Sequence, residues 1–144
     1  MRRRVTLVLT LALALSAALA LTACGTSKED KAKAQVCEAR DDIRKQVTEL
    51  QNITAGTPTP AALKGVLDAI GNDLKQIKNA QPDLKSERQA AVKKAKDQFE
   101  SDLTQITANF AKNMSLTNAR ERLVQVSTSV ALAFQSTLQP IDCN

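Results

Sequence analysis

The residues of this chain that could do covalent chemistry are its three cysteines, Cys24, Cys37 and Cys143. A thiol can be acylated, can pair as a disulfide or, when a neighbouring base activates it, can act as a nucleophile. The 144 residues contain no histidine, which is the commonest general base and metal ligand at neutral pH. The sequence therefore points to acylation and cross-linking rather than to catalysis.

Cys24 follows a leader with a basic start, 17 uncharged and largely apolar residues from Val5 to Leu21, and two small residues. The stretch Leu21-Thr22-Ala23-Cys24 resembles the lipobox of bacterial lipoproteins. This resemblance implies that residues 1–23 are a signal peptide, that a peptidase cuts between Ala23 and Cys24, and that Cys24 carries a diacylglyceryl group. We then expect the protein at the extracytoplasmic face of the cell membrane. An uncleaved anchor is the alternative, because 17 such residues almost span a bilayer.

Acylation of Cys24 would leave Cys37 and Cys143 as the remaining thiols. An exported chain meets an oxidising compartment, so we expect these two cysteines to form a disulfide. The bridge would close a loop of roughly a hundred residues, which is worth on the order of 4–5 kcal/mol through its effect on the unfolded chain. For a small domain this is a large share of the net stability.

The charge balance argues against a nucleic-acid partner. Of the 20 lysines and arginines, Arg2, Arg3 and Arg4 belong to the leader, which leaves 17 against 15 aspartates and glutamates. Binding to nucleic acid requires a concentrated basic face, which such a near-neutral chain does not provide. The membrane, through lipid on Cys24, and an envelope protein or the cell wall are the expected partners.

Two polar clusters were weighed as binding sites. Glu38, Asp41 and Asp42 could form a weak cation site, but acids in the first turns of a helix are usually solvated residues that favour the helix dipole. The lysines of residues 93–96 are better explained as a solvated basic turn than as an anion site. No glycine-rich phosphate loop is present. We therefore expect no catalytic residue, no metal ion and no cofactor.

The 121 residues that follow the leader fit one small domain, with a tether and a helix start at 24–35 and a helical domain at 36–144. The first apolar stripe at helical spacing is Val36, Ala39, Ile43, Val47 and Leu50. It ends at a Gly- and Pro-rich breaker, after which Thr59 is the expected N-cap and Pro60 the first helical residue. The last helix carries Leu123, Val126, Val130, Phe134, Leu138 and Ile141, with Val124 and Ala131 widening its apolar face.

The segment between these helices allows two interpretations at Pro82. Its stripe keeps one phase throughout: Leu63, Leu67, Ile70, Leu74, Ile77, Leu84, Val92, Ala95, Phe99, Leu103, Ile106 and Phe110. Unbroken phase favours one long helix kinked at Pro82, in a three-helix antiparallel bundle. A capping box of Ser86 and Gln89 instead favours a turn and a new helix, in a four-helix bundle. We expect an all-α, elongated bundle and prefer the kinked helix.

The whole pattern resembles small secreted or lipid-anchored helical proteins of high-GC Gram-positive bacteria. In these a cysteine that opens the first helix, here in Val36-Cys37-Glu38-Ala39-Arg40-Asp41-Asp42, is matched by one near the C-terminus, here in Ile141-Asp142-Cys143. The resemblance covers about residues 36–144 and carries over no functional residue. We expect a non-catalytic envelope lipoprotein that acts as an interaction or structural module. The alternative is a carrier or sensor of an apolar ligand, held between helices that part at Pro82 beside the polar residues Gln81 and Arg88.

Overall fold

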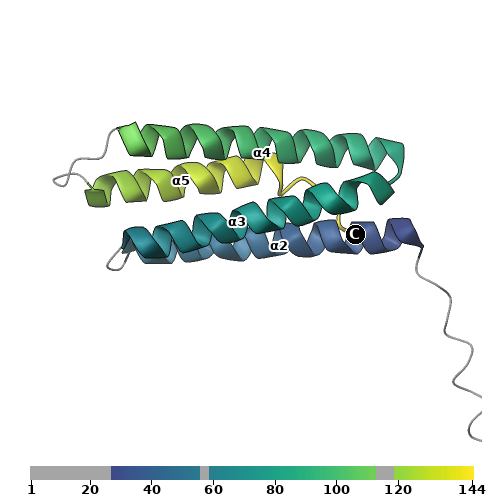
Figure 1. Cartoon of the computed structure of the whole chain (residues 1–144), viewed down its shortest axis with the longest axis horizontal. Coiled ribbons are helices and arrows are strands. Elements are labelled where there is room, and N and C mark those ends of the chain that lie inside the picture. The colour runs from purple at the N-terminus through teal and green to yellow at the C-terminus, as the bar shows by residue number, and fades with distance from the viewer. Residues whose placement is uncertain (1–26, 56–58, 113–118) are drawn as a thin grey trace, which may run out of the picture.

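The computed structural model describes residues 27–55, 59–112 and 119–144, and in these ranges the chain forms four α-helices and no strand. Helix α2 spans Lys28–Ala55, α3 Pro60–Ala80, α4 Ser86–Lys112 and α5 Ala119–Thr137, and a short 3₁₀ helix, η1 (Gln81–Asp83), lies between α3 and α4. The helices lie along the long axis of an elongated bundle (Figure 1). The expectation of an all-α antiparallel bundle is confirmed.

Each helix packs against two others: α2 and α4 each contact both α3 and α5. The connections are short, so consecutive helices are antiparallel. The contact between α3 and α4 is the sparsest of the four. The molecule is therefore two helical hairpins, α2–α3 and α4–α5, which lie one above the other in Figure 1 and are joined mainly along α2 and α5.

Helix α2 buries the stripe expected from its sequence, and the same face continues to either side. The buried side chains are Ala32, Val36, Ala39, Ile43, Val47, Leu50 and Thr54. The helix begins at Lys28, inside the segment 24–35 that was expected to hold its start. Its 28 residues give it a length of about 42 Å at 1.5 Å per residue.

The start of α3 is the one that its sequence indicates. Thr59 has an extended backbone (φ −115°, ψ 146°), and its Oγ1 accepts a hydrogen bond from the N–H of Ala62 at 3.2 Å. Pro60 is the first helical residue, where its missing N–H leaves no hydrogen bond unmade. The predicted cap is confirmed. The cap expected at Ser115 or Thr117 lies outside the described residues.

The preferred single helix kinked at Pro82 is wrong, and the chain turns there instead. Gln81 keeps helical angles (φ −51°, ψ −43°), so the residue before the proline is not where the backbone departs from helix. Pro82 lies in the first turn of η1, where a backbone N–H would have no partner within the helix, so its absence from proline breaks no hydrogen bond. Leu84 then becomes extended (φ −80°, ψ 153°), and α4 begins at Ser86. The broken alternative, with four helices, is the one adopted.

The apolar periodicity favoured a single helix because its phase is preserved across this turn. Leu84 and Val92 lie on either side of the start of α4, and both are buried in the core that α3 also faces. A turn that returns the chain to the same core can keep the phase of a continuous helix. Phase alone therefore does not distinguish one helix from two.

The buried face of helix α5 differs from the expected one at Val124, Ser127 and Ala133. Ala131 is buried, but Val124 is 45% exposed, and Ser127 and Ala133 are buried in addition to the predicted stripe. The helix ends at Thr137, before Pro140, and the chain continues in turns.

Two aromatic side chains meet in the core. The rings of Phe99 and Phe134 lie edge to face, with centroids 6.5 Å apart, and Phe99 is completely buried. Farther along α4, the expected core residues Leu103, Ile106 and Phe110 are only partly buried against the core. We call this end, where α2 leads to α3 and α4 to α5, the loop end. The opposite end, which holds Ser27, η1 and Cys143, is the disulfide end.

Candidate interaction surface

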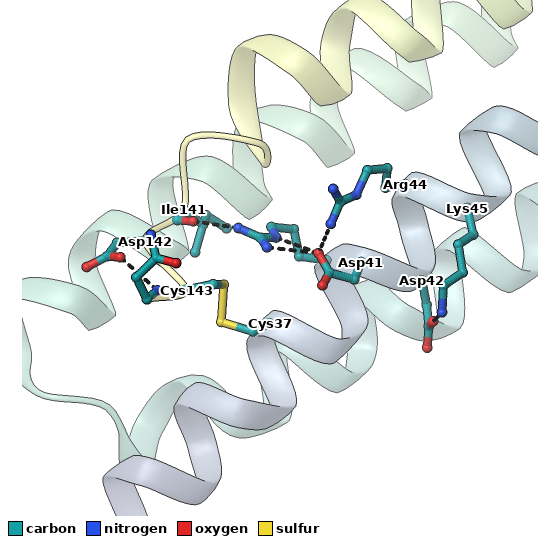
Figure 2. Close-up of polar contacts among 10 residues, drawn as sticks. Cys37, Asp41, Asp42, Arg44, Lys45, Ile141, Asp142 and Cys143 are labelled. Atoms are coloured by element: carbon teal, nitrogen blue, oxygen red, sulfur yellow. Dashed lines mark hydrogen bonds and ion pairs between the residues drawn. A yellow bond between two sulfur atoms is a disulfide. The ribbon is translucent and has the colours of Figure 1, made fainter.

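The predicted disulfide is present and defines the disulfide end of the bundle. Cys37 on α2 is bonded to Cys143, with the two Cα atoms 5.7 Å apart (Figure 2). The Arg40 guanidinium donates a hydrogen bond to the carbonyl oxygen of Ile141 at 2.8 Å, and the Lys33 ammonium bonds the backbone oxygen of Asn144. One covalent and two polar links thus hold the C-terminal tail, residues 138–144, against α2.

Helix α2 is capped at the residue that follows the tether. Ser27 Oγ accepts from the N–H of Asp30 at 3.1 Å, and the Asp30 carboxylate accepts from the Ser27 N–H at 3.2 Å. The Ser27 hydroxyl also donates to Asp30 at 2.7 Å, and these bonds hold the pKa of Asp30 below its usual value of 3.8. The sequence signal for this capping box is Ser27 with an acid three residues later, inside the segment 24–35 that was expected to hold the tether and the helix start. The proposed acylation site, Cys24, and the cleavage position after Ala23 lie outside the described residues.

The polar residues next to Pro82 have structural partners. Glu29, near the start of α2, forms ion pairs with Lys85 at 3.1 Å and with Arg88 at 3.5 Å. Gln81 bonds within the turn, where its carbonyl accepts from the N–H of Leu84. Arg88 therefore links the start of α4 to α2, and Gln81 closes the turn of η1. Because both residues have structural partners, they no longer indicate a ligand site at Pro82.

The three acids weighed as a cation site are dispersed among cations. Asp41 is paired with Arg40 at 2.8 Å and with Arg44, and Asp42 is paired with Lys45 at 2.8 Å (Figure 2). Partial burial alone would raise the pKa of Asp41, but the two guanidinium groups hold it below 3.8. Glu38 is exposed. Within the described ranges, no group of three or more acidic, histidine or cysteine side chains is placed to hold a metal ion.

The basic turn of α4 contains lysines in two different situations. Lys93 is paired with Asp97, and the buried Lys96 is paired with Asp97 at 2.7 Å and with Glu100 at 2.9 Å. The hydrogen bonds from Lys93 and Lys96 lower the pKa of Asp97 to about 2. Lys94 is exposed and has no carboxylate partner among the described residues. The solvated turn expected from the sequence is found at Lys93 and Lys94, which are exposed, but not at Lys96, which is buried.

One polar contact lies between α2 and α3. The Gln46 side-chain amide donates to the Asp73 carboxylate at 2.6 Å, while its carbonyl oxygen is buried and has no partner among the described residues. Burial raises the pKa of Asp73 above 3.8, and the negative charges of Asp42 and Glu38 add to this shift against the opposing effect of the Gln46 hydrogen bond. The contact is a structural one, since it lies within the α2–α3 hairpin.

The outer side of the α4–α5 hairpin is hollowed along much of its length. A loop-end hollow of about 120 Å³ lies beside Phe110 and Arg122, and a wide, shallow middle hollow of about 540 Å³ lies beside Leu132. A tail hollow of about 290 Å³ lies between α4 and the residues that follow α5. The loop-end and middle hollows share Ile106 and other residues, and the middle and tail hollows share Ser136. Together they form one groove, which we call the α4–α5 groove.

An exposed leucine lies in the middle of this groove. Leu132 is 60% exposed and lines the middle hollow, while Val124 on the same helix is 45% exposed. Single exposed apolar residues are ordinary on protein surfaces, but one that borders a groove is a candidate contact residue. Leu132 could not be singled out from the sequence, because a leucine next to the apolar stripe of a helix is expected to pack inward.

Within the described ranges, no helix is long and apolar enough to span a lipid bilayer. Comparisons with protein-family models, with curated proteins and with solved structures find no match to this chain.

Proposed function

We propose that this protein is a lipid-anchored, extracytoplasmic lipoprotein, without catalytic activity, whose helical bundle binds another envelope protein or the cell wall through the α4–α5 groove. The anchor would be a lipid on Cys24, after removal of residues 1–23. The observation that carries the proposal is Leu132, which is largely exposed at the centre of a groove that follows two helices.

The start of α2 supports the anchoring part of the proposal. The helix is capped at Ser27, three residues after Cys24, and an extended chain covers at most about 3.6 Å per residue. A lipid on Cys24 would therefore keep the disulfide end within about 11 Å of the anchor point. The long axis could then extend away from the lipid surface, with the side of α4 and α5 accessible to a partner. The Cys37–Cys143 disulfide is also in keeping with an oxidising compartment.

The dimensions of the groove suit a helical or extended peptide segment. Between Arg122 and Ser136, the α5 residues of the loop-end and middle hollows span about 21 Å, which is close to four helical turns. Its lining combines the apolar side chains of Ile106 and Leu132 with amides such as Gln105. An amphipathic segment of a partner could bury its apolar side against these apolar side chains and form hydrogen bonds with the amides.

Site-specific photo-crosslinking in cells tests the partner. A photoreactive residue placed at Leu132 should yield a discrete adduct with an envelope component. The same residue placed at Glu49, which is exposed on α2 and lines none of the three hollows, should not. Adducts of equal intensity from both positions, or from neither under any growth condition, would count against the groove as the binding surface.

Metabolic labelling tests the anchor independently. A clickable fatty acid should label the wild-type chain, and Cys24→Ser should abolish the label and leave unprocessed precursor. Two acyl chains at about 0.8 kcal/mol per buried CH₂ make the anchor effectively irreversible, so high salt should not release the protein. Label that persists in Cys24→Ser would place the lipid on another residue.

A further inference from the structure

We propose that the tail hollow binds an anionic amphiphile, with its hydrocarbon chain against the apolar lining and its head group at Lys94. This inference goes beyond the partner proposed above; the site is argued from the residues of the hollow, and its closeness to lipid rests on the proposed acylation of Cys24. The ligand class includes free fatty acids and anionic phospholipids, which share a negatively charged head group and an alkyl chain.

The lining of the tail hollow is mostly apolar. Ala91 and Ala95 of α4 form one side, and Pro140 and Ile141 of the tail form the other. The two alanines leave a gap that longer side chains would fill. The volume of about 290 Å³ is near the lower bound of about 300 Å³ for small-ligand sites, which suits an alkyl chain rather than a bulky ring system.

The tail side of the hollow is held in place by links already described. The Ile141 carbonyl accepts from Arg40, the Ile141 N–H donates to the carbonyl of Leu138 at 3.1 Å, and Cys143 is covalently bonded to Cys37. The wall opposite α4 is therefore formed before any ligand arrives. A preformed wall lowers the ordering cost of binding, which matters for a shallow site.

The charge of the hollow selects the head group. Lys94 is the one charged residue in its lining, and no acidic residue lines it. The nearby lysines, Lys93 and Lys96, are neutralised by Asp97 and Glu100, whereas Lys94 has no carboxylate partner in the described part of the chain. The Gln98 side-chain amide, which also lines the hollow, donates a hydrogen bond to the Asp102 carboxylate at 3.0 Å, and its second N–H can donate to a carboxylate or phosphate oxygen. A cation without a carboxylate partner beside an apolar surface matches an anionic amphiphile.

The position of the hollow makes both ligand sources accessible. Glu29 of α2 is paired with Lys85 and Arg88, so the starts of α2 and α4 lie at the same level. Ala91 lies five residues into α4, about 8 Å along the bundle from that end. If Cys24 is acylated, the hollow lies close to the lipid surface, where both free fatty acids and phospholipid head groups are concentrated.

Photoaffinity labelling of the full chain in its native membranes tests the proposal. The first probe is dodecanoate that carries a diazirine and an alkyne on its chain. The second is phosphatidylglycerol with the same modified chain, and the third is the corresponding neutral dodecanol. Cleavage after acidic residues releases residues 88–97 as one peptide and is unaffected by changes at the lysines. We expect one or both anionic probes to label this peptide saturably, and the alcohol to label it about fivefold less, as for loss of one exposed charge contact.

Four variants make the test specific. Lys94→Gln should reduce labelling by the anionic probes about fivefold, while Lys93→Gln, the same loss of charge one residue away, should leave it unchanged. Ala91→Phe should reduce labelling more than tenfold, because the ring fills the hollow. Ala91 is exposed, so the fold should tolerate the change, and Ala91→Met provides a second filling variant if it does not.

The outcomes separate cleanly. Labelling by dodecanoate alone identifies a fatty-acid site, and labelling by phosphatidylglycerol alone identifies a phospholipid site; both support the proposal. Equal effects of Lys93→Gln and Lys94→Gln, or equal labelling by the alcohol, would overturn the role of Lys94. Labelling that unlabelled dodecanoate does not compete, or that survives both filling variants, would overturn the hollow as the site. None of these results depends on whether Leu132 contacts a protein partner.

Discussion

Replacement of both bridging cysteines, Cys37→Ser with Cys143→Ser, is expected to lower the free energy of unfolding by about 4 kcal/mol. The bridge spans a sequence separation of 106 residues. For a loop of this length the chain-entropy model gives about 4.7 kcal/mol, because the unfolded chain regains the freedom that the bridge removed. Measured losses for native disulfides are about 2–5 kcal/mol, so the calculated value is near the upper limit. Changing both residues avoids a free thiol that could react further.

The stabilisation by the bridge must be distinguished from that by the neighbouring polar contacts, which would also weaken without the bridge. Arg40→Met keeps the bridge and the aliphatic packing but removes the hydrogen bond to the Ile141 carbonyl, together with the ion pair with Asp41. A hydrogen bond from a charged donor is worth about 1.5–3 kcal/mol, and the partly exposed setting of Arg40 places the expected loss at the lower end. The double cysteine variant should therefore lose more stability than this control.

Urea unfolding followed by circular dichroism measures both variants. With a dependence on urea of about 1–3 kcal/mol/M, a loss of about 4 kcal/mol lowers the midpoint by about 2 M. The slope should rise in the double cysteine variant, because an unfolded chain without the bridge exposes more surface, and should stay unchanged in Arg40→Met. A double variant that unfolds within about 0.5 kcal/mol of the parent would refute the reasoning. So would an Arg40→Met variant that reproduces the whole loss, because the stabilisation would then come from docking of the tail.

Asp73→Asn should raise the free energy of unfolding at neutral pH, because burial raises the pKa of the Asp73 carboxyl and the folded chain therefore binds its proton more tightly than the unfolded chain does. The cost of ionising Asp73 in the folded chain is absent below pH 3.8 and develops as the pH rises through the raised pKa. Thermal melts of variant and parent should therefore converge at acid pH and separate at neutral pH. Ser27→Ala should accelerate amide exchange in the first turn of α2 about fivefold, because it removes a cap worth about 1 kcal/mol, with exchange in α3 as the unchanged reference. Phe99→Ala should cost about 3–5 kcal/mol in urea unfolding, since Phe99 is completely buried, and the partly buried Phe110→Ala, its matched control, should cost clearly less.

The core could be predicted from the sequence because helical periodicity depends on local spacing. All five stripe residues of the first helix are buried, from Val36 to Leu50, and the Thr59–Pro60 start is found where the cap signal indicated. The pairing of Cys37 with Cys143 followed from a count of thiols once Cys24 was assigned to lipid. These inferences need no knowledge of which helix packs against which.

The remaining features could not be predicted, because they depend on the distance between helices. Periodicity shows which face of α4 is apolar, but not that Leu103 and Ile106 are only partly buried or that the contact between α3 and α4 is the sparsest in the bundle. The same holds for Leu132, which is 60% exposed in the middle hollow between α4 and α5. Among lysines with similar spacing, only the placement of Asp97 and Glu100 distinguishes the paired Lys96 from Lys94.

The two ends of the bundle differ in how they are held, and this bears on where a partner or ligand could act. At the disulfide end, α2 is linked to other segments by the bridge, by the Glu29 ion pairs and by the bonds of Arg40 and Lys33 to the tail. Near the loop end, the polar contact between α2 and α5 in the described part of the chain is a 3.4 Å approach of two hydroxyl groups, Thr54 and Ser127.

Local opening should therefore cost least at the loop end, where the apolar residues of α4 are already partly exposed. A protein partner that needs α4 and α5 to adjust their spacing would find the required freedom in the loop-end and middle hollows. The tail hollow has the opposite character, because its tail wall is fixed by Cys143 and Arg40. One groove thus combines an adaptable surface far from the disulfide with a preformed site beside it, which is why we assign the protein partner and the amphiphile to different parts of the same face.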